Sequence, residues 1–126
     1  MKKIILDTNF LLIPVQLKVD IFSEFHRIMD QKYQLCVLEP SLVELKKLQK
    51  IAKTKTAANV AFQLIEKKDV TVLPSAEPYV DDAIVHYAEK EPVIVATRDK
   101  ALMDSLRNQG TPVITLRQKK YLIFRP

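Results

Sequence analysis

The chain has 126 residues, 48% of them hydrophobic and 28% charged, and its net charge is +5. This length is too small for two ordinary domains, so we expect one domain over residues 1–126. The apolar runs are much shorter than the roughly 18 residues of a membrane span, which excludes a membrane-spanning protein and a membrane partner. The single cysteine, Cys36, excludes an intramolecular disulfide framework and favours a cytoplasmic protein. With only two histidines beside it, a zinc-finger set is excluded as well. The single glycine, Gly110, excludes glycine-rich phosphate loops.

The predicted elements alternate between strands and helices along the chain. Residues 3–7 begin basic and then apolar, like a signal peptide, but Asp7 interrupts the run after three apolar residues, so we interpret them as a first strand. Apolar runs predict further strands at 34–38, 70–73, 93–96 and 113–116, with a possible edge strand at 121–124. Helical spacing of apolar residues predicts helices at 20–29, from Pro40 to about residue 51, and at 56–67, 81–89 and 100–108, the last stopped by Gly110.

Short apolar strands separated by helices are typical of the α/β class. We expect a three-layer sandwich, with a mainly parallel central sheet of about five strands and helices on both faces. In such a sheet the ligand site lies beyond the carboxyl ends of the strands, where loops leave for the helices. This edge is therefore the place to search for functional residues.

Acidic residues follow four of the five predicted strands at this edge. Asp7 ends the first strand, Glu39 and Glu44 follow the second, Asp81 and Asp82 the third, and Asp99 the fourth. Carboxylates gathered together repel one another unless a cation lies among them. Oxygen ligands without Cys or His point to a hard ion, Mg²⁺ or Mn²⁺.

These residues resemble those of the PIN-domain nucleases, over essentially the whole chain. The matching pieces are an apolar strand that leads into Asp7, Thr8 and Asn9, a helix that carries Glu44, the stretch DDAIV at 81–85, and VATRDKAL at 95–102. The last piece, followed by GTPVI at 110–114, is most similar to the PIN proteins of ribosomal RNA processing and their archaeal relatives, and less similar to the toxins of toxin–antitoxin pairs.

The resemblance implies a metal-dependent endoribonuclease with a PIN-like fold and a possible role in ribosomal RNA processing. It implies an acidic site of Asp7, Glu44, Asp82 and Asp99, in which Asp7, Asp82 and Asp99 ligate one or two Mg²⁺ or Mn²⁺ ions. Glu44 would be a further ligand or the base that orients the attacking water. The family pattern places the helix acid before a small residue and two apolar ones, which fits Asp82 better than Asp81.

Each of these carboxylates also has a purely structural interpretation, which the sequence leaves open. Asp7 can simply start a turn, and the segment from Ser41 to Glu44 reads as a capping box. Asp99 precedes a helix and can be its N-cap, and of Asp81 and Asp82 we assign the first as a cap. Two further residues, Asn9 and Thr97, are secondary candidates that could hold a water or orient a carboxylate, or could serve only their turns.

The basic residues are concentrated in two regions. Residues 45–65 contain five lysines and no acid, and residues 98–126 contain seven lysines or arginines against two aspartates. This distribution is expected of a protein that attracts a polyanion, although the lysines of the first region would also suit a solvated helix face. The RNA-binding candidates are Lys46, Lys50, Lys53, Arg98, Lys119 and Lys120.

RNA is the partner that follows from these residues, and the resemblance adds protein partners. It implies a possible homodimer paired through helices, and a partner of the ribosome-assembly or antitoxin type. The sequence gives no independent sign of either. The RNA target, the cleavage position, the number of ions and the regulator are not specified by any motif.

Two competing functions remain at the sequence level. The first is a PIN-like module that binds RNA or a processing complex as a scaffold without cutting. The second is a phosphatase with Asp7 as nucleophile, since haloacid-dehalogenase-like enzymes also end their first strand in an aspartate. Those enzymes carry a second aspartate two residues later, where this chain has Asn9, so the general acid is missing.

Overall fold

The computed structural model describes residues 1–126 and contains one six-stranded sheet, in the order β3-β2-β1-β4-β5-β6. The first five strands are parallel to their neighbours, and β6 pairs antiparallel with β5. The mainly parallel sheet is therefore confirmed, and the edge strand at the C-terminus is present. The strands are β1 (Lys2–Leu6), β2 (Tyr33–Leu38), β3 (Thr71–Leu73), β4 (Val93–Ala96), β5 (Val113–Arg117) and β6 (Tyr121–Arg125).

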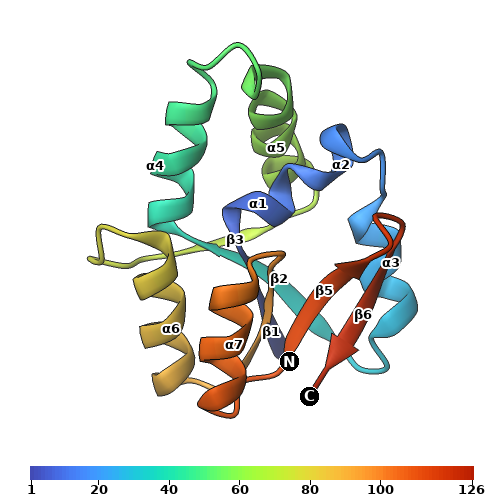
Figure 1. Ribbon diagram of the computed structural model, residues 1–126, viewed down its shortest axis with the longest axis vertical. Coiled ribbons are helices and arrows are strands. Elements are labelled where there is room, and N and C mark those ends of the chain that lie inside the picture. Colours follow the sequence, from blue (N-terminus) through green and yellow to red (C-terminus); the bar gives the residue numbers. More distant parts are fainter.

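Seven helices cover the two faces of this sheet (Figure 1). Helices α6 and α7 pack on one face and the other five contribute to the core on the opposite face, so the three-layer sandwich is confirmed. No helix is both long and apolar enough to span a lipid bilayer. The helices are α1 (Thr8–Leu11), α2 (Ile13–Gln16), α3 (Ile21–Ile28), α4 (Glu39–Leu48), α5 (Lys55–Lys67), α6 (Val80–Lys90) and α7 (Lys100–Asn108).

The strands alternate their side chains between two hydrophobic cores. In β1, Ile4 and Leu6 join the core under α1–α5, whereas Ile5 joins the core under α6 and α7. In β4, Ile94 and Val95 divide between the same two cores. Strands that are buried on both faces have apolar side chains at every position, which explains the continuous apolar runs of the sequence.

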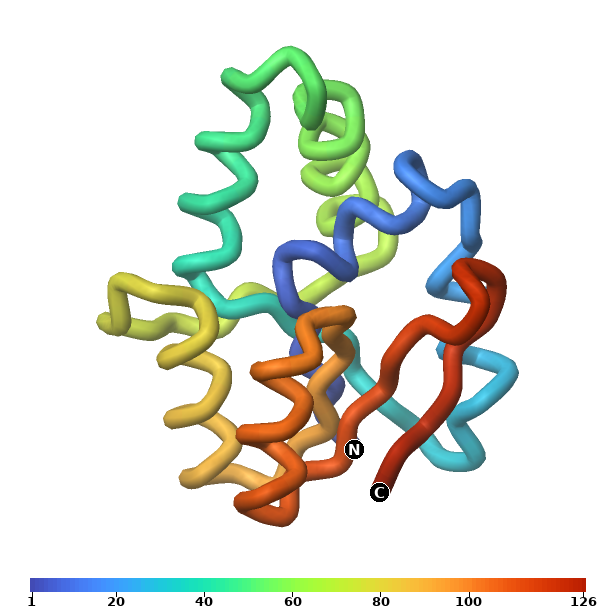
Figure 2. The backbone as a smooth tube through the Cα atoms, in the orientation of Figure 1, coloured from blue at the N-terminus to red at the C-terminus, as the bar shows by residue number.

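Two short helices were not predicted. Helices α1 and α2 have four residues each and occupy the segment between β1 and α3. One turn is too short to show a helical period in the sequence, and these turns form because their apolar side chains, such as Phe10 and Ile13, are fully buried in the larger core. The backbone tube in Figure 2 shows this segment crossing the molecule just beyond the end of β1.

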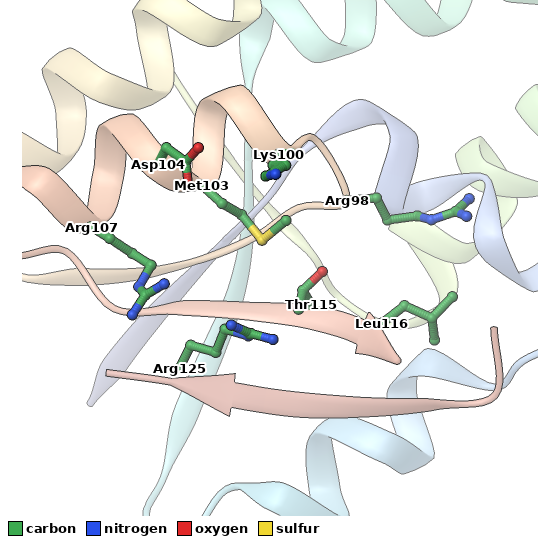
Figure 3. A pocket seen from close by; sticks show the side chains of 8 residues that line it. All are labelled: Arg98, Lys100, Met103, Asp104, Arg107, Thr115, Leu116 and Arg125. Carbon is green, nitrogen blue, oxygen red and sulfur yellow. The ribbon is translucent and has the colours of Figure 1, made fainter. Parts of the chain in front are cut away.

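The helix α7 ends as the sequence predicts. Gly110 follows the C-cap residue with φ of 83°, and its N–H donates to the carbonyl of Arg107. Thr111 N–H donates to the carbonyl of Leu106, which completes the cap. This turn directs the chain into β5, so that α7 runs alongside the β5–β6 hairpin (Figure 3).

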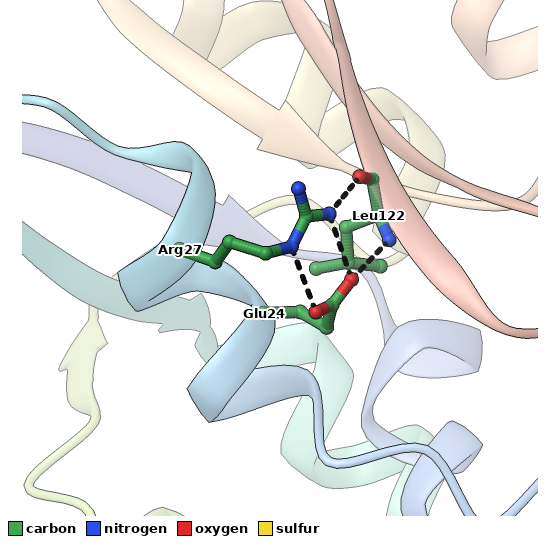
Figure 4. A network of polar contacts seen from close by, with 3 residues as sticks. All are labelled: Glu24, Arg27 and Leu122. Atoms are coloured by element: carbon green, nitrogen blue, oxygen red, sulfur yellow. Dashed lines mark hydrogen bonds and ion pairs between the residues drawn. The ribbon is translucent and has the colours of Figure 1, made fainter.

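A polar network attaches β6 to α3 on the opposite face (Figure 4). Glu24 accepts hydrogen bonds from Arg27 Nε at 3.0 Å and from the Leu122 backbone N–H at 2.8 Å, and Arg27 Nη2 donates to the Leu122 carbonyl at 2.9 Å. These bonds lower the pKa of the Glu24 carboxyl, with Arg27 as the main cause. The outer strand is thus held by side chains as well as by its pairing with β5.

Replacing Glu24 by alanine should lower the free energy of unfolding by about 1–3 kcal/mol, because the N–H of the buried Leu122 loses its acceptor. The loss should shrink as the pH falls below 4.5, the ordinary pKa of Glu24, because a carboxyl with a lowered pKa stabilises the fold only while it is ionised. Urea unfolding at pH 7 and pH 3 measures both effects. The matched control, the exposed Glu66→Ala, should change stability by less than about 0.5 kcal/mol, and an equal loss in both variants would contradict the role of the network.

Candidate active site

The site is built where β1 and β4 end side by side. These strands are parallel neighbours with Leu6 opposite Ala96, so the residues that follow them, Asp7 and Thr97, emerge together. The Asp7 N–H donates to the carbonyl of Ala96 at 2.9 Å, which fixes the two chain ends against each other. Side chains that are 90 positions apart in the sequence are thereby brought into contact.

Thr97 links the two aspartates of this edge. Its hydroxyl donates to Asp7 Oδ2 at 2.6 Å and accepts a hydrogen bond from the Asp99 N–H at 3.0 Å. Thr97 is fully buried, and Asp7 is only 4% exposed. Asp7 Oδ1 accepts from the Thr8 N–H at 2.8 Å, so both carboxylate oxygens of Asp7 are held in place.

Asp99 is the N-cap of α7, as one of its two interpretations predicts. Its Oδ1 accepts from the Leu102 N–H at 3.0 Å, while its Oδ2 accepts no hydrogen bond from the protein. Capping uses one oxygen and leaves the other for a ligand, so the two interpretations of Asp99 are compatible. Asn9 Oδ1 accepts from the Arg98 N–H at 3.3 Å and so ties the same loop to the segment after β1.

The capping-box interpretation of Glu44 is wrong. Helix α4 begins at Glu39 with Leu38 at the N-cap position, so Ser41 lies inside the first turn and Glu44 in the body of the helix. Pro40 takes up a place in the first turn, where its missing N–H costs nothing, and this starts the helix earlier than a serine cap would. Glu44 is exposed and makes no hydrogen bond within the protein, so its carboxylate is available to a ligand.

The assignment of Asp81 as a helix cap is also wrong. The N-cap of α6 is Tyr79, which makes no side-chain capping bond, and both Asp81 and Asp82 lie in the first turn of the helix. Adjacent helical residues point about 100° apart, so only one of the two can face the rest of the site. The packing of Val80 and Ala83 against the sheet sets the rotation of α6 about its axis, and so decides which of the two aspartates faces the site.

Burial and neighbouring acids raise the pKa values of two carboxyl groups at this edge, Asp7 and Asp81. Burial raises the pKa of Asp7 to about 6, the hydrogen bonds from Thr97 and Thr8 oppose the shift, and the charges of Asp81 and Glu44 add to it. The pKa of Asp81 is raised by partial burial and then by Asp99, Glu44 and Asp82. No lysine or arginine contributes to the pKa shift of either aspartate. The three ion pairs of the structure lie elsewhere.

Of the two helix acids, Asp81 is the one whose charge acts on Asp7. Its charge contributes to the raised pKa of Asp7, whereas Asp82 acts on Asp81 and on the exposed His86. His86 itself bonds to Glu77 at 2.7 Å on the outside of α6. The prediction that Asp82 is the ligand stays open, and the electrostatics favour Asp81.

The donor set fits a hard cation that keeps part of its own water. No group of three or more Asp, Glu, His or Cys side chains is arranged to enclose an ion. Mg²⁺ in proteins is usually bound through one or two carboxylates and several waters, so a closed cage is not required. The side chains at this edge are oxygen donors that form no ion pair with a lysine or arginine. Two buried hydroxyls, Thr8 Oγ1 and Ser41 Oγ, have no protein partner.

The predicted RNA-binding residues are all at the surface. Lys46 lies in the last turn of α4, Lys50 and Lys53 lie in the connection to α5, and both helices extend beyond the carboxyl edge of the sheet (Figure 1). Lys119 and Lys120 form the turn between β5 and β6, and Arg98 stands directly beside Asp99. Their part in RNA binding stays a prediction. Cys36 is fully buried in β2, as expected of a small hydrophobic residue.

Two basic residues that were not among the sequence candidates lie toward the opposite edge of the sheet, at the last turn of α7 and at the end of β6. Arg107 on α7 and Arg125 at the end of β6 line one pocket together with Arg98 and Lys100. The sequence shows their charges but not their proximity, because that depends on the antiparallel pairing of β6. Only the helical spacing of Lys100 and Arg107, seven residues apart, was a visible signal.

Known proteins resemble this chain over most of its length. A family model described as a PIN like domain matches residues 4–119. Ribonuclease VapC4 of Methanocaldococcus jannaschii is 39% identical, with 96% of this chain and 95% of that protein covered. The rRNA-processing protein fcf1 of Schizosaccharomyces pombe is 27% identical over 97% of this chain, which spans 62% of that protein. The solved structure of the PIN domain endonuclease Utp24 superposes with a TM-score of 0.82 at 26% identity, covering 97% of this chain and 90% of that one.

Replacing Asp7 by asparagine should stabilise the metal-free protein. Because the pKa of Asp7 is about 6 in the folded state and 3.8 ordinarily, its ionised form costs stability on the order of 3 kcal/mol above pH 6, and this cost disappears as the pH falls toward 4. We expect Asp7→Asn to raise the free energy of unfolding by about 1–3 kcal/mol at pH 8 in EDTA, with the gain vanishing near pH 4.

Urea unfolding of both proteins at pH 8 and pH 4 measures this gain. The exposed Asp30→Asn is the matched control and should change little at either pH. An Asp7→Asn protein that is less stable than the wild type at pH 8 would show that the carboxylate is not strained by its surroundings.

Proposed function

Because the chain belongs to the PIN-like domain family, we propose that it is a metal-dependent endoribonuclease that hydrolyses RNA phosphodiester bonds at the edge formed by Asp7 and Asp99. The observation that carries this proposal is the buried Asp7 carboxylate, joined through Thr97 to Asp99 and left without a basic partner. A cation that binds there relieves a repulsion already present in the folded protein.

The relatives support the reaction class more strongly than the biological setting. One is a ribonuclease and another a PIN domain endonuclease, so cleavage of RNA within the chain is the reaction that we propose. A role in ribosomal RNA processing is supported by the name of the fcf1 protein and by the sequence resemblance. We therefore propose, as a second and more specific part of the function, that the RNA substrate is ribosomal RNA during its processing.

The residues that would hold Mg²⁺ or Mn²⁺ are Asp7 and Asp99, assisted by an acid of α6. Both oxygens of Asp7 accept one hydrogen bond each and keep a further lone pair, and Asp99 Oδ2 is free of the protein. Such an ion, when bound, lowers the pKa of a water and neutralises charge on the phosphate oxygens. Thr97 keeps the two aspartates in a fixed relation, so they need not be ordered when substrate arrives.

Glu44 is suited to act on the nucleophile. Its carboxylate is exposed on α4, makes no hydrogen bond within the protein, and lies close enough to Asp7 and Asp81 to raise their pKa values. An oxygen in this position can accept the proton of the attacking water, or orient that water toward the phosphorus. We therefore propose Glu44 as the general base, with binding of the ion as its second possible task.

A second function, a PIN-like module that binds RNA without cutting it, is favoured by one observation. No three carboxylates converge on a single ion position, so turnover depends on waters and on the substrate to complete the site. The cleavage assay below separates the two functions, because a scaffold binds RNA and does not shorten it. A homodimer and a partner protein stay predictions under either function.

A structured RNA should be cleaved by the wild type with Mg²⁺ or Mn²⁺ and not with EDTA. The variants Asp7→Asn and Asp99→Asn should each lose at least about 100-fold in cleavage rate, because each removes an anionic ligand, and Glu44→Gln should lose about 10- to 100-fold. Gel analysis of a 5′-labelled RNA measures all of these rates. The exposed Asp30→Asn is the control for loss of one negative charge, and unchanged cleavage in both aspartate variants would remove the catalytic assignment.

Mg²⁺ should raise the melting temperature of the wild type by several degrees, because binding to the folded state alone stabilises it by about 2.7 kcal/mol at 100 times Kd. The rise should be absent in Asp99→Asn and strongly reduced in Asp81→Asn, and should persist in Asp82→Asn, whose side chain does not act on Asp7. Differential scanning fluorimetry with and without the ion measures these shifts. If the rise in melting temperature persists in Asp81→Asn and is lost in Asp82→Asn, then Asp82, not Asp81, faces the ion. Equal rises in all four proteins would place the ion elsewhere.

A further inference from the structure

A basic groove runs between α7 and the β5–β6 hairpin, starting next to the carboxylate edge (Figure 3). We define the basic groove by its four cations, Arg98, Lys100, Arg107 and Arg125. It encloses about 480 Å³. Arg98 and Lys100 flank Asp99 in the sequence, whereas Arg107 and Arg125 lie at the far end, so the groove leads away from the site along α7.

The charges of the basic groove are not neutralised within the protein. None of its four cations takes part in an ion pair, and the single acid at its wall, Asp104, is exposed and unpaired. The Nε–H of Arg125 is buried and has no hydrogen-bond acceptor. A buried donor without an acceptor is costly, and the guanidinium group that carries it lines the groove, where an anion can accept from its other N–H groups.

The spacing of the cations favours an extended anion over a compact one. Lys100 and Arg107 are separated by two helical turns, or about 10 Å along α7 at 1.5 Å per residue. A single phosphate cannot contact both ends of such a row, whereas successive phosphates of a strand can. Guanidinium groups match phosphate oxygens in bidentate geometry, and Arg107 and Arg125 present two of them at the far end.

The floor of the basic groove suits a nucleotide strand as well. Met103 lies half-buried between the cations and offers an apolar surface for a ribose or base, and the Thr115 side chain borders the same space. A strand that leaves the carboxylate edge past Arg98 would enter the groove directly. Recognition of this kind reads the backbone and gives affinity without choice of sequence.

We propose that the basic groove binds consecutive phosphates of the RNA strand next to the bond that is cut, with Arg107 and Arg125 as the outer phosphate contacts. This inference rests on the proposed function for the identity of the strand. It adds a substrate-binding surface to the carboxylate edge, on the side opposite to the lysines of α4 and of the α4–α5 connection. The groove orients RNA and takes no part in the chemical step.

The test measures the affinity for a fluorescein-labelled single-stranded RNA of 12 nucleotides by fluorescence anisotropy. The buffer contains EDTA so that no cleavage occurs. The Arg107→Gln/Arg125→Gln variant should bind about tenfold or more weakly than the wild type at low salt. The slope of log K against log[salt] should become less negative by about 1.4, since each phosphate contact on a single strand contributes about 0.7. The charge-matched control Lys32→Gln/Lys67→Gln, whose exposed lysines lie outside the groove, should bind within about threefold of the wild type.

Two further variants protect the test against misfolding. Arg125 is partly buried, so Arg107→Gln alone, at an exposed position, should reproduce about half of the change in slope. Arg107→Lys/Arg125→Lys keeps the charge and should recover most of the slope. Equal binding by the groove variant and the lysine control, or no binding of RNA by the wild type, would overturn the proposal and leave an acidic protein surface as the partner for these charges.

Cleavage assays of the same variants separate this proposal from the proposed function. If the wild type binds through the groove but cuts no RNA with Mg²⁺ or Mn²⁺, the groove assignment holds and the nuclease assignment fails. If the wild type cuts RNA and the groove variants bind and cut equally well, the groove assignment fails and the nuclease assignment holds.

Discussion

The Thr97 hydroxyl is the contact on which the arrangement of the site depends. It donates to Asp7 and accepts from the backbone of Asp99, so one fully buried side chain joins the ends of two strands to the start of α7. The parallel pairing of β1 and β4 makes this contact possible, because it places Asp7 and Thr97 beside each other. A site that is fixed in this way before substrate arrives needs little reorganisation when it binds an ion.

The same arrangement stores an electrostatic cost in the folded protein. Asp7 is buried among other acids, and its pKa is raised to about 6. Four lysines and arginines line the basic groove beside this edge, and none of them forms an ion pair with its carboxylates. Negative charge at the centre and positive charge on the flanks is the distribution expected when a cation and a polyanion bind together, the cation between carboxylate and phosphate.

The sequence predicted the repeating elements of the fold and the edge of the sheet at which acidic residues follow the strands, but not the local geometry of that edge. Runs such as Val93 to Ala96 were recognisable as strands because both faces of the sheet are buried, whereas α1 and α2 are too short to show a period. The order of the strands places Asp7, Asp81 and Asp99 at one edge, whereas the sequence predicted Asp82 rather than Asp81 as the site residue of α6. The rotation of α6, the absence of a capping box in α4 and the groove under Arg107 depend on packing between elements, which no local pattern encodes.

The central claim is that a divalent ion occupies the edge formed by Asp7 and Asp99. Anomalous diffraction from a crystal soaked in Mn²⁺ tests this claim most directly, because the ion is located without reference to activity. The account predicts an anomalous peak within coordinating distance of Asp7 and of Asp99 Oδ2, with the Asp81 carboxylate turned toward it. A fully soaked crystal with no peak at this edge, or with its peak only at other acidic side chains, would contradict the account.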